Sequence, residues 1–137
     1  ICAAPQYLSE HGVPATPADL LDHRCFNFSF VSPWNKWSFL QDGEGVSVPV
    51  TASASFTQGD LLRDMALSGA GVVKLADFHI GLDVKAGTLV PLLEEFKSGI
   101  IEPVYLLYSD RKHLSPRIRV FIEFFQEKWR QNPWKVT

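Results

Sequence analysis

The chain has 137 residues, of which 46% are hydrophobic and 20% charged, a composition typical of one globular domain with a modest core. Its formal charge of -2 and its lack of a Lys/Arg cluster argue against a surface that grips the phosphates of nucleic acid. Two cysteines are too few for a disulfide framework or a zinc site, so neither a metal nor a cofactor is expected.

The first segment reads as the middle of a longer polypeptide. Residues 1–4 form an apolar run that resembles a buried strand, and the first residue is Ile, not Met. No stretch is long and apolar enough to cross a membrane. A clear helix start follows, with Thr16 as the cap, Pro17 at the first helical position and Asp19 completing a capping box. A short helix is predicted to extend to about Asp22.

Three strands are predicted next, joined as an antiparallel meander. Residues 24–30 alternate phenylalanine with smaller side chains, which is the period of a half-buried strand. Residues 37–40 form the second strand, and residues 41–45 form a hairpin loop. Residues 46–56 resume the alternation, with Pro49 at an edge or a bulge, where its missing N–H is tolerated.

The central helix is predicted to start near Gln58, with Thr57 as its N-cap. Its apolar stripe is interrupted by Gly69 and Gly71, after which residues 72–76 form a short strand. The free amides at the helix start can hold a carboxylate or another anion. The alternative is that Thr57 and water satisfy those amides, which is the usual arrangement at a helix start.

The last third of the chain predicts a helix at residues 78–85, a strand at 88–93 and a nearly continuous apolar strand at 103–108. The last of these is typical of a strand buried on both faces. A long amphipathic helix opens at Ser115-Pro116 and continues to Asn132-Pro133. Alternating strands and short helices place the chain in the α/β class with a mixed sheet.

No catalytic constellation can be assembled, because the four histidines are scattered and no nucleophile, phosphate-loop or dinucleotide motif is present. The chain is therefore not expected to be an enzyme. Phe30, Trp34 and Trp37 bracket a loop that contains Ser32, and these residues can line a pocket for a flat or carboxylated ligand. The more common role of such aromatic residues is packing.

The order of motifs resembles the C-terminal effector-binding domain of LysR-type transcriptional regulators over nearly the whole chain. The motifs are A-A-P-Q-Y-L-S-E-H-G-V-P-A-T-P-A-D-L-L-D-H-R-C, W-S-F, G-D-L-L-R-D-M-A-L-S-G-A-G-V-V, A-G-T-L-V-P-L-L and L-S-P-R-I-R-V-F-I-E-F-F. The departure is at residues 74–77, where many members of the family carry a proline near the strand end.

This resemblance implies a periplasmic-binding-protein-like fold of type 2 with two lobes, of which the second is complete and the first only partly present. Residues 1–5 would be a hinge strand from the first lobe, residues 6–93 the second lobe, and residues 94–137 the return to the first lobe with its C-terminal helix. A winged helix-turn-helix would lie further towards the N-terminus, outside this chain.

The same resemblance implies a cytoplasmic bacterial transcription regulator that holds a small effector, carboxylate or aromatic, between its lobes. DNA would be bound only through the winged helix-turn-helix, and no membrane partner is expected. The rival is a periplasmic solute-binding protein of a transporter, which a signal peptide upstream would reveal. The residues implied as effector-binding are Thr57, Gln58, Phe30, Ser32, Trp34, Phe78 and His79.

A homo-oligomer, dimer or tetramer, is also implied, because the central helix resembles the surface through which family members pair head to tail. For any one of these residues, packing in the core is the alternative. The residues implied as the oligomer interface are Leu61, Leu62, Arg63 and Met65.

Overall fold

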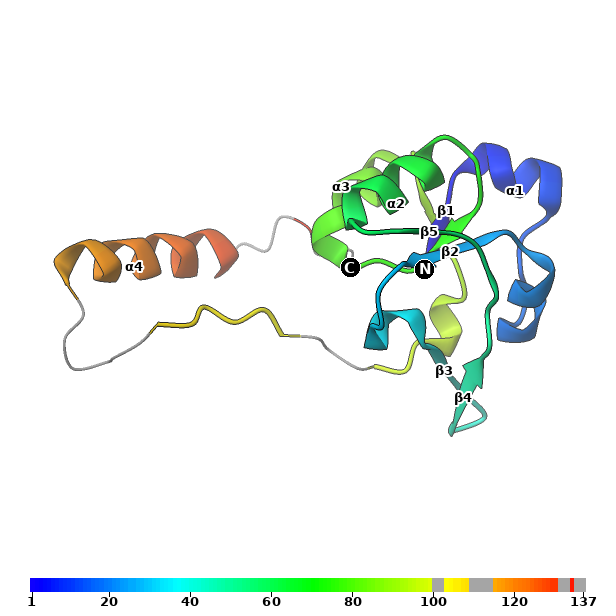
Figure 1. The fold of residues 1–137 in the computed structure, drawn as a ribbon, viewed down its shortest axis with the longest axis horizontal. Helices are drawn as coiled ribbons and strands as arrows, with labels where there is room; N and C mark the ends of the chain where they lie inside the picture. Colours follow the sequence, from blue (N-terminus) through cyan, green and yellow to red (C-terminus); the bar gives the residue numbers. More distant parts are fainter. Residues whose placement is uncertain (100–102, 109–114, 131–133, 135–137) are drawn as a thin grey trace.

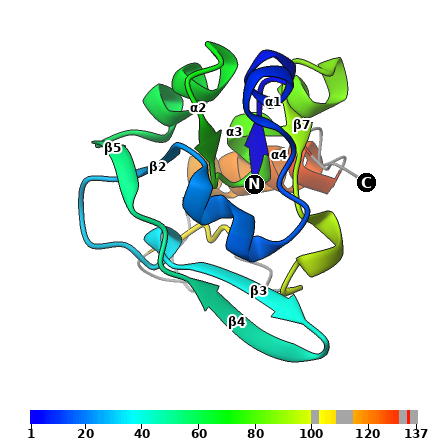
Figure 2. The same ribbon diagram turned by 90° about the vertical axis from the view of Figure 1, so that its right-hand side faces the viewer.

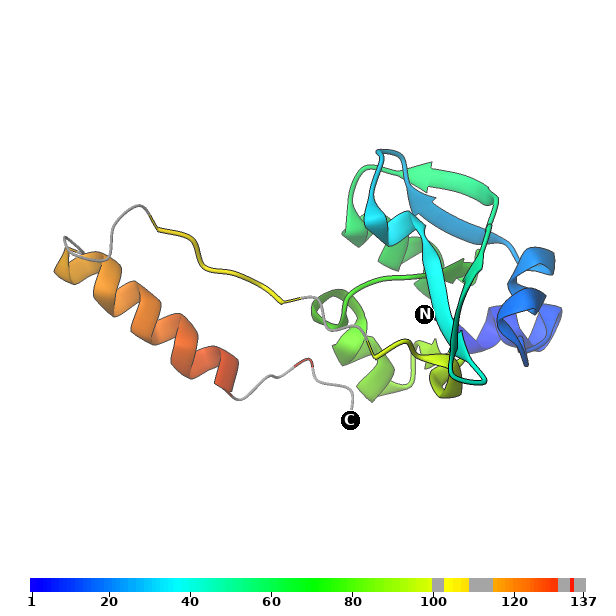
Figure 3. The ribbon, with the colours of Figure 1, turned by 90° about the horizontal axis from the view of Figure 1, so that it is seen from below.

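The computed structural model describes residues 1–99, 103–108, 115–130 and 134, and these fall into two parts (Figure 1). Residues 1–97 form a layered body that we call the lobe. Residues 103–108 and helix α4 (Pro116–Arg130) extend away from it, and we call them the arm (Figures 1 and 3).

A five-stranded mixed sheet forms the centre of the lobe, with the strand order β5-β2-β6-β1-β7. Strand β2 is parallel to both β5 and β6, whereas β1 is antiparallel to both β6 and β7. Four of the five strands therefore point the same way, and β1 alone runs against them. The strands are β1 (Cys2–Ala3), β2 (Cys25–Phe28), β5 (Ala52–Phe56), β6 (Val72–Val73) and β7 (Val90–Pro91).

Both faces of this sheet are covered, so the lobe has a core on each side. One core lies under helices α2 and α3, and it includes Leu62, Ala66 and Ile80. The other is formed with α1, the 3-10 helix η1 and a β3–β4 hairpin. In Figure 2, η1 and the hairpin lie on the opposite side of the lobe from α2 and α3, whereas α1 lies at the top with those two helices. These elements are α1 (Pro5–His11), η1 (Pro17–Asp22), β3 (Trp37–Gln41), β4 (Glu44–Val48), α2 (Gly59–Leu67) and α3 (Asp77–Ala86).

The expected half-buried strand at residues 24–30 is wrong, because β2 is buried on both faces. Cys25 is 0% exposed and belongs to the core under α1, whereas Phe26 and Phe28 belong to the core under α2. An interior strand between two covered faces has no solvent side. The alternation in sequence reflects large and small core positions, not buried and exposed ones.

The expected meander is also wrong. Strands β3 and β4 form a separate two-stranded sheet, and Asp42 and Gly43 make its tight turn with φ of 52° and 83°. Two successive positive φ angles match the right-handed twist of the flanking strands. Strand β4 ends at Val48, just before Pro49, which has no N–H for a ladder. The chain then crosses back, and β5 pairs in parallel with β2.

The two predicted helix starts have different outcomes. At η1 the predicted capping box is confirmed, because the Asp19 carboxylate accepts hydrogen bonds from the backbone N–H groups of Ala15 and Thr16, both at 2.9 Å. These bonds lower the pKa of Asp19. At α2 the predicted cap is wrong by one residue, since the N-cap is Gln58 and not Thr57, and its side chain makes no capping bond.

The arm keeps its predicted helix but not its predicted strand. Among the described residues no strand pairs with residues 103–108, and Tyr105 and Leu107 are 74% and 89% exposed. An extended segment without a neighbouring strand cannot form ladder hydrogen bonds. Helix α4 begins at Pro116 as predicted, and its expected end at residues 132–133 lies outside the described residues. In the described part of the chain, no helix has the length and apolarity needed to span a membrane.

Candidate functional site

The loops that follow four strands of the lobe gather along one side of the sheet, which we call the carboxyl edge. Strands β2, β5 and β6 run in parallel, and β7 shares their direction because β1 is antiparallel to both β6 and β7. The carboxyl edge therefore collects residues 29–36, 57–58, 74–79 and 92–97. Ligands of open α/β sheets bind outside the carboxyl ends of the strands, so this edge is the first place to look for a site.

The loop after β2 is held in shape by Asn35. Its Oδ1 accepts from the Phe28 N–H at 2.9 Å, and its Nδ2 donates to the carbonyls of Phe28 and Phe30 at 2.9 and 3.0 Å. The Ser32 hydroxyl accepts from the Trp34 N–H at 3.1 Å. Phe30 and Trp34 pack on the Phe28 ring yet remain 48% and 36% exposed. The loop thus presents two aromatic side chains from a fixed backbone.

The starts of α2 and α3 are in direct contact. The His79 ring lies over Gly59, where an added Cβ would stand 2.5 Å from the imidazole Nε2. His79 Nδ1 is 3.4 Å from an Asp60 carboxylate oxygen, and its ring packs against Phe78 with centroids 4.3 Å apart. Gly59 is therefore needed for this close approach. The contact places the expected residues Gln58, Phe78 and His79 at one junction.

The aromatic loop is joined to this junction through β5. The Ser29 N–H donates to the Phe56 carbonyl at 2.9 Å, and Thr57 and Gln58 follow directly along the chain. Lys74, which follows β6, donates from Nζ to the Lys36 carbonyl at 2.9 Å. The structure thus brings all seven residues expected to bind an effector to the carboxyl edge.

The four residues expected at an oligomer interface differ in exposure. Leu61 is 44% exposed and Met65 is half-buried, whereas Leu62 is 1% exposed and lies in the core. Arg63 forms a bidentate ion pair with Asp83 on α3, with N–O distances of 2.6 and 2.7 Å, and this hydrogen bonding raises the pKa of Arg63. Leu62 and Arg63 therefore fix α2 in the lobe, while Leu61 and Met65 contribute to its outer surface.

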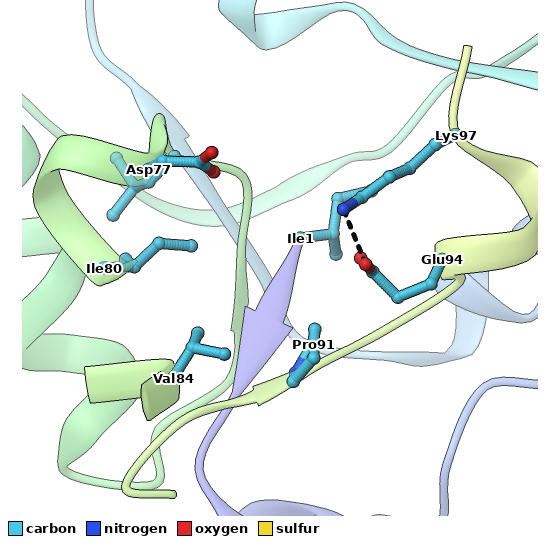
Figure 4. Close-up of a pocket in the computed structure, with 8 residues that line it drawn as sticks. Ile1, Asp77, Ile80, Val84, Pro91, Glu94 and Lys97 are labelled. Carbon is cyan, nitrogen blue, oxygen red and sulfur yellow. Dashed lines mark ion pairs between the residues drawn. The ribbon is translucent and has the colours of Figure 1, made fainter. Parts of the chain in front are cut away.

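A hollow at the start of β1 was not expected from the sequence (Figure 4). It lies on the carboxyl edge, because β1 begins where β6 and β7 end. Its floor is apolar, and its rim carries Asp77 on one side and a Lys97–Glu94 ion pair on the other (Figure 4). The lining residues are Ile1, Leu75, Asp77, Ile80, Val84, Pro91, Glu94 and Lys97.

The sequence holds no signal for this hollow, since its residues come from three separate segments. Only the pairing of β1 between β6 and β7 brings them together. Within the described part of the chain, no group of three or more His, Cys, Asp or Glu side chains is placed to hold a metal ion.

Comparisons with known proteins agree on one family. A family model described as the LysR substrate binding domain matches residues 1–130. The HTH-type transcriptional regulator CrgA of Neisseria meningitidis serogroup B is 34% identical over 132 residues, which cover 96% of this chain and 44% of CrgA. The chain thus spans less than half the length of this relative.

Comparisons with solved structures indicate the same family. The CrgA regulatory domain matches with a TM-score of 0.84 and 34% identity, over 92% of this chain and 62% of that structure. The full-length Vibrio cholerae virulence activator AphB matches with a TM-score of 0.75 and 27% identity, over 90% of this chain and 42% of AphB.

Proposed function

This chain belongs to the LysR substrate-binding domain family, and from that premise we propose that it is the effector-sensing part of a bacterial LysR-type transcription regulator. It has the periplasmic-binding-protein-like fold of LysR regulatory domains. In this proposal DNA is bound in the cytoplasm by a helix-turn-helix N-terminal to this chain. The matched relatives are named as transcription regulators, which are not enzymes. These names support the proposal.

The proposed architecture has two lobes. Residues 1–5 are the hinge strand from the first lobe, residues 6–93 the second lobe, and residues 94–137 the return to the first lobe. Strands β1 and β7 support this division, because they are neighbours, and the start of β1 and the end of β7 both lie at the carboxyl edge. The arm supports it too, since Phe121 and Phe124 are 53% and 55% exposed and need a surface to cover them.

We place the effector at the carboxyl edge, between the lobes. The observation that carries this proposal is the convergence of the aromatic loop, the α2 start and the α3 start on that edge. Aromatic faces of Phe30 and Trp34 suit a flat ring, and the amides at the start of α2 suit a carboxylate. Binding there closes or reorients the lobes and shifts the population read out by the DNA-binding part.

We place an oligomer contact on the outer surface of α2. Leu61 and Met65 are its contact residues, because both are on the helix surface next to the core residue Leu62. The Arg63–Asp83 ion pair holds this surface at a fixed angle to α3. The contact would join this lobe to the first lobe of a second subunit.

A reporter assay in the full-length regulator tests the effector site. Thr57→Ala and Gln58→Ala are each expected to shift the half-maximal effector concentration about five- to thirteenfold, because loss of one ligand hydrogen bond costs about 1–1.5 kcal/mol. The matched controls are Thr51→Ala, just before β5 and so at its opposite end, and Gln41→Ala in the β3–β4 hairpin. An unchanged response in both test variants would rule out this site.

The glycine under His79 offers an independent test. Gly59→Ala is expected to displace the imidazole and weaken the effector response while leaving the lobe folded, because the side chain can rotate away from the new Cβ. Gly45→Ala is the control, since an added Cβ there meets nothing within 4 Å. Equal responses for the two alanine variants would show that His79 plays no part in effector binding.

A further inference from the structure

A buried hydroxyl joins helix α1 to the junction between η1 and β2. Tyr7 is 0% exposed, and its oxygen accepts from the backbone N–H of Arg24 at 2.9 Å. The same hydroxyl lies 3.1 Å from Nδ1 of His23. Because the N–H of Arg24 can only donate, the Tyr7 proton is left for His23. His23 Nδ1 therefore accepts it, which requires a neutral ring.

A second histidine, His11, contacts both Tyr7 and Arg24. The His11 ring stacks on Tyr7 with centroids 4.4 Å apart and an interplanar angle of 11°. Its Nε2 is 2.9 Å from Nη2 of Arg24, and its Nδ1 is 3.1 Å from the Tyr7 carbonyl. A guanidinium has donors and no acceptor, so Nε2 accepts and the Nδ1–H donates to the carbonyl.

The charges that face His23 come from all three elements. Burial lowers the pKa of His23, and the neighbouring His11 of α1 lowers it further. Asp19 and Asp22 of η1 act in the opposite direction. Arg24, which directly precedes β2, adds a fixed positive charge beside His11, where its guanidinium lies 5.7 Å from the Tyr7 ring centroid. Protonation of His23 would thus add a second positive charge, besides that of Arg24, next to the buried Tyr7 side chain.

We propose that Tyr7, His11, His23 and Arg24 form an acid-sensitive latch that ties α1 to the η1–β2 junction and opens when His23 takes up a proton. Protonated His23 turns a proton towards the Tyr7 hydroxyl, which then has no acceptor in its buried position. No ligand is needed, so the latch stands or fails independently of the proposed effector site.

The direction of the pH effect follows from the neutral His23 ring of the closed latch. Since the closed latch lowers the pKa of His23, the open form binds more protons, and the latch is fully stabilising above the ordinary histidine pKa of about 6.5. Its contribution is lost as the pH falls below that value. Helix α1 directly follows the interior strand β1, so opening frees the element next to the proposed hinge.

Hydrogen exchange of the full-length protein at pH 7.5 and 5.5 tests this latch. Protection of α1 is divided by protection of α2 at the same pH, because the intrinsic pH dependence of exchange is common to both. The ratio is expected to fall on acidification, because the open form binds more protons. A ratio that does not change with pH overturns the proposal.

Variants separate the latch from general acid sensitivity. In the double variant His11→Gln/His23→Gln the ratio should no longer depend on pH, because the amides can accept hydrogen bonds but do not titrate. In Tyr7→Phe it should be low at both pH values. The control Gln41→Ala, in the β3–β4 hairpin, should keep the full pH dependence of α1. A pH dependence that survives in the double variant, or disappears in Gln41→Ala, contradicts the assignment.

Discussion

The lobe and the arm contain similar apolar side chains but bury them very differently. In the lobe, Trp37 and Tyr7 are 0% exposed, and Leu62 is 1% exposed. In the arm, Leu107 is 89% exposed, and none of the described residues of α4 is buried. Local sequence specifies a helix or an extended segment in both regions, but burial needs a neighbouring surface, which only the lobe supplies for itself.

The size of this difference points to a missing contact. Full burial of a large apolar side chain is worth about 1.5–3 kcal/mol, so the stripe along α4 carries a large unrealised stabilisation. Helix α4 has 15 residues, and isolated helices of about 12–15 residues are marginal in water. In the two-lobed architecture proposed above, the first lobe covers this face and stabilises the helix.

The largest expected effect comes from a pair of aromatic truncations in this 137-residue chain. Trp37→Ala should lower the free energy of unfolding by about 3–5 kcal/mol, because it leaves a cavity in the core. It also removes the indole donor to Asn27 Oδ1, which lies 2.8 Å away. Phe121→Ala should cost less than about 1 kcal/mol, since that side chain is 53% exposed. Urea denaturation measures both, and equal costs would contradict the division into lobe and arm.

A smaller effect is expected from adding one methyl group to the lobe. At Gly71 a Cβ would clash with the Arg24 carbonyl and lie 2.8 Å from the Phe26 ring. Gly71→Ala should therefore cost about 1–3 kcal/mol of unfolding free energy through overpacking. The control is Gly45→Ala, because an added Cβ there meets nothing within 4 Å. If thermal denaturation ranks the two variants equally, the lobe is less tightly packed than described.

The smallest effect is expected from two arginine ion pairs, one in each region. Arg63→Ala should cost about 1 kcal/mol, because its bidentate partner Asp83 is only 12% exposed. Arg130→Ala should have no measurable cost, since Arg130 and Glu127 are 76% and 67% exposed and 3.3 Å apart. A double-mutant cycle for each pair gives the coupling energies. A larger coupling energy for Arg130–Glu127 than for Arg63–Asp83 would contradict the division into lobe and arm.

The sequence predicts short-range features well. The helix starts at Thr16-Pro17 and Ser115-Pro116 depend on neighbouring residues alone, and both are confirmed. The order of motifs was sufficient to identify the family, which the comparisons confirm. The N-cap of α2 was missed by one residue, because Thr57 is the better capping side chain but Gln58 occupies the position.

Long-range features are less predictable, because they depend on which strands meet. The pattern of Phe26 and Phe28 fits a half-exposed strand as well as a strand between two cores. Alternation alone could not show that β5 leaves the hairpin to join β2. The residues expected to bind an effector lie in loops at the carboxyl edge, but the hollow beside Ile1 depends on β1 lying between β6 and β7. Residues 103–108 have a strand sequence, but among the described residues no strand pairs with them.

The measurement that tests the central claim most directly is amide hydrogen exchange of α4 and residues 103–108, in this chain alone and in the full-length protein. The account predicts equal protection of the lobe sheet in both samples. It predicts little protection of the arm in the isolated chain and strong protection in the full-length protein, where the first lobe covers it. An arm that exchanges equally fast in both would show that its apolar face is not covered by the rest of the regulator, and the two-lobed assignment would be wrong.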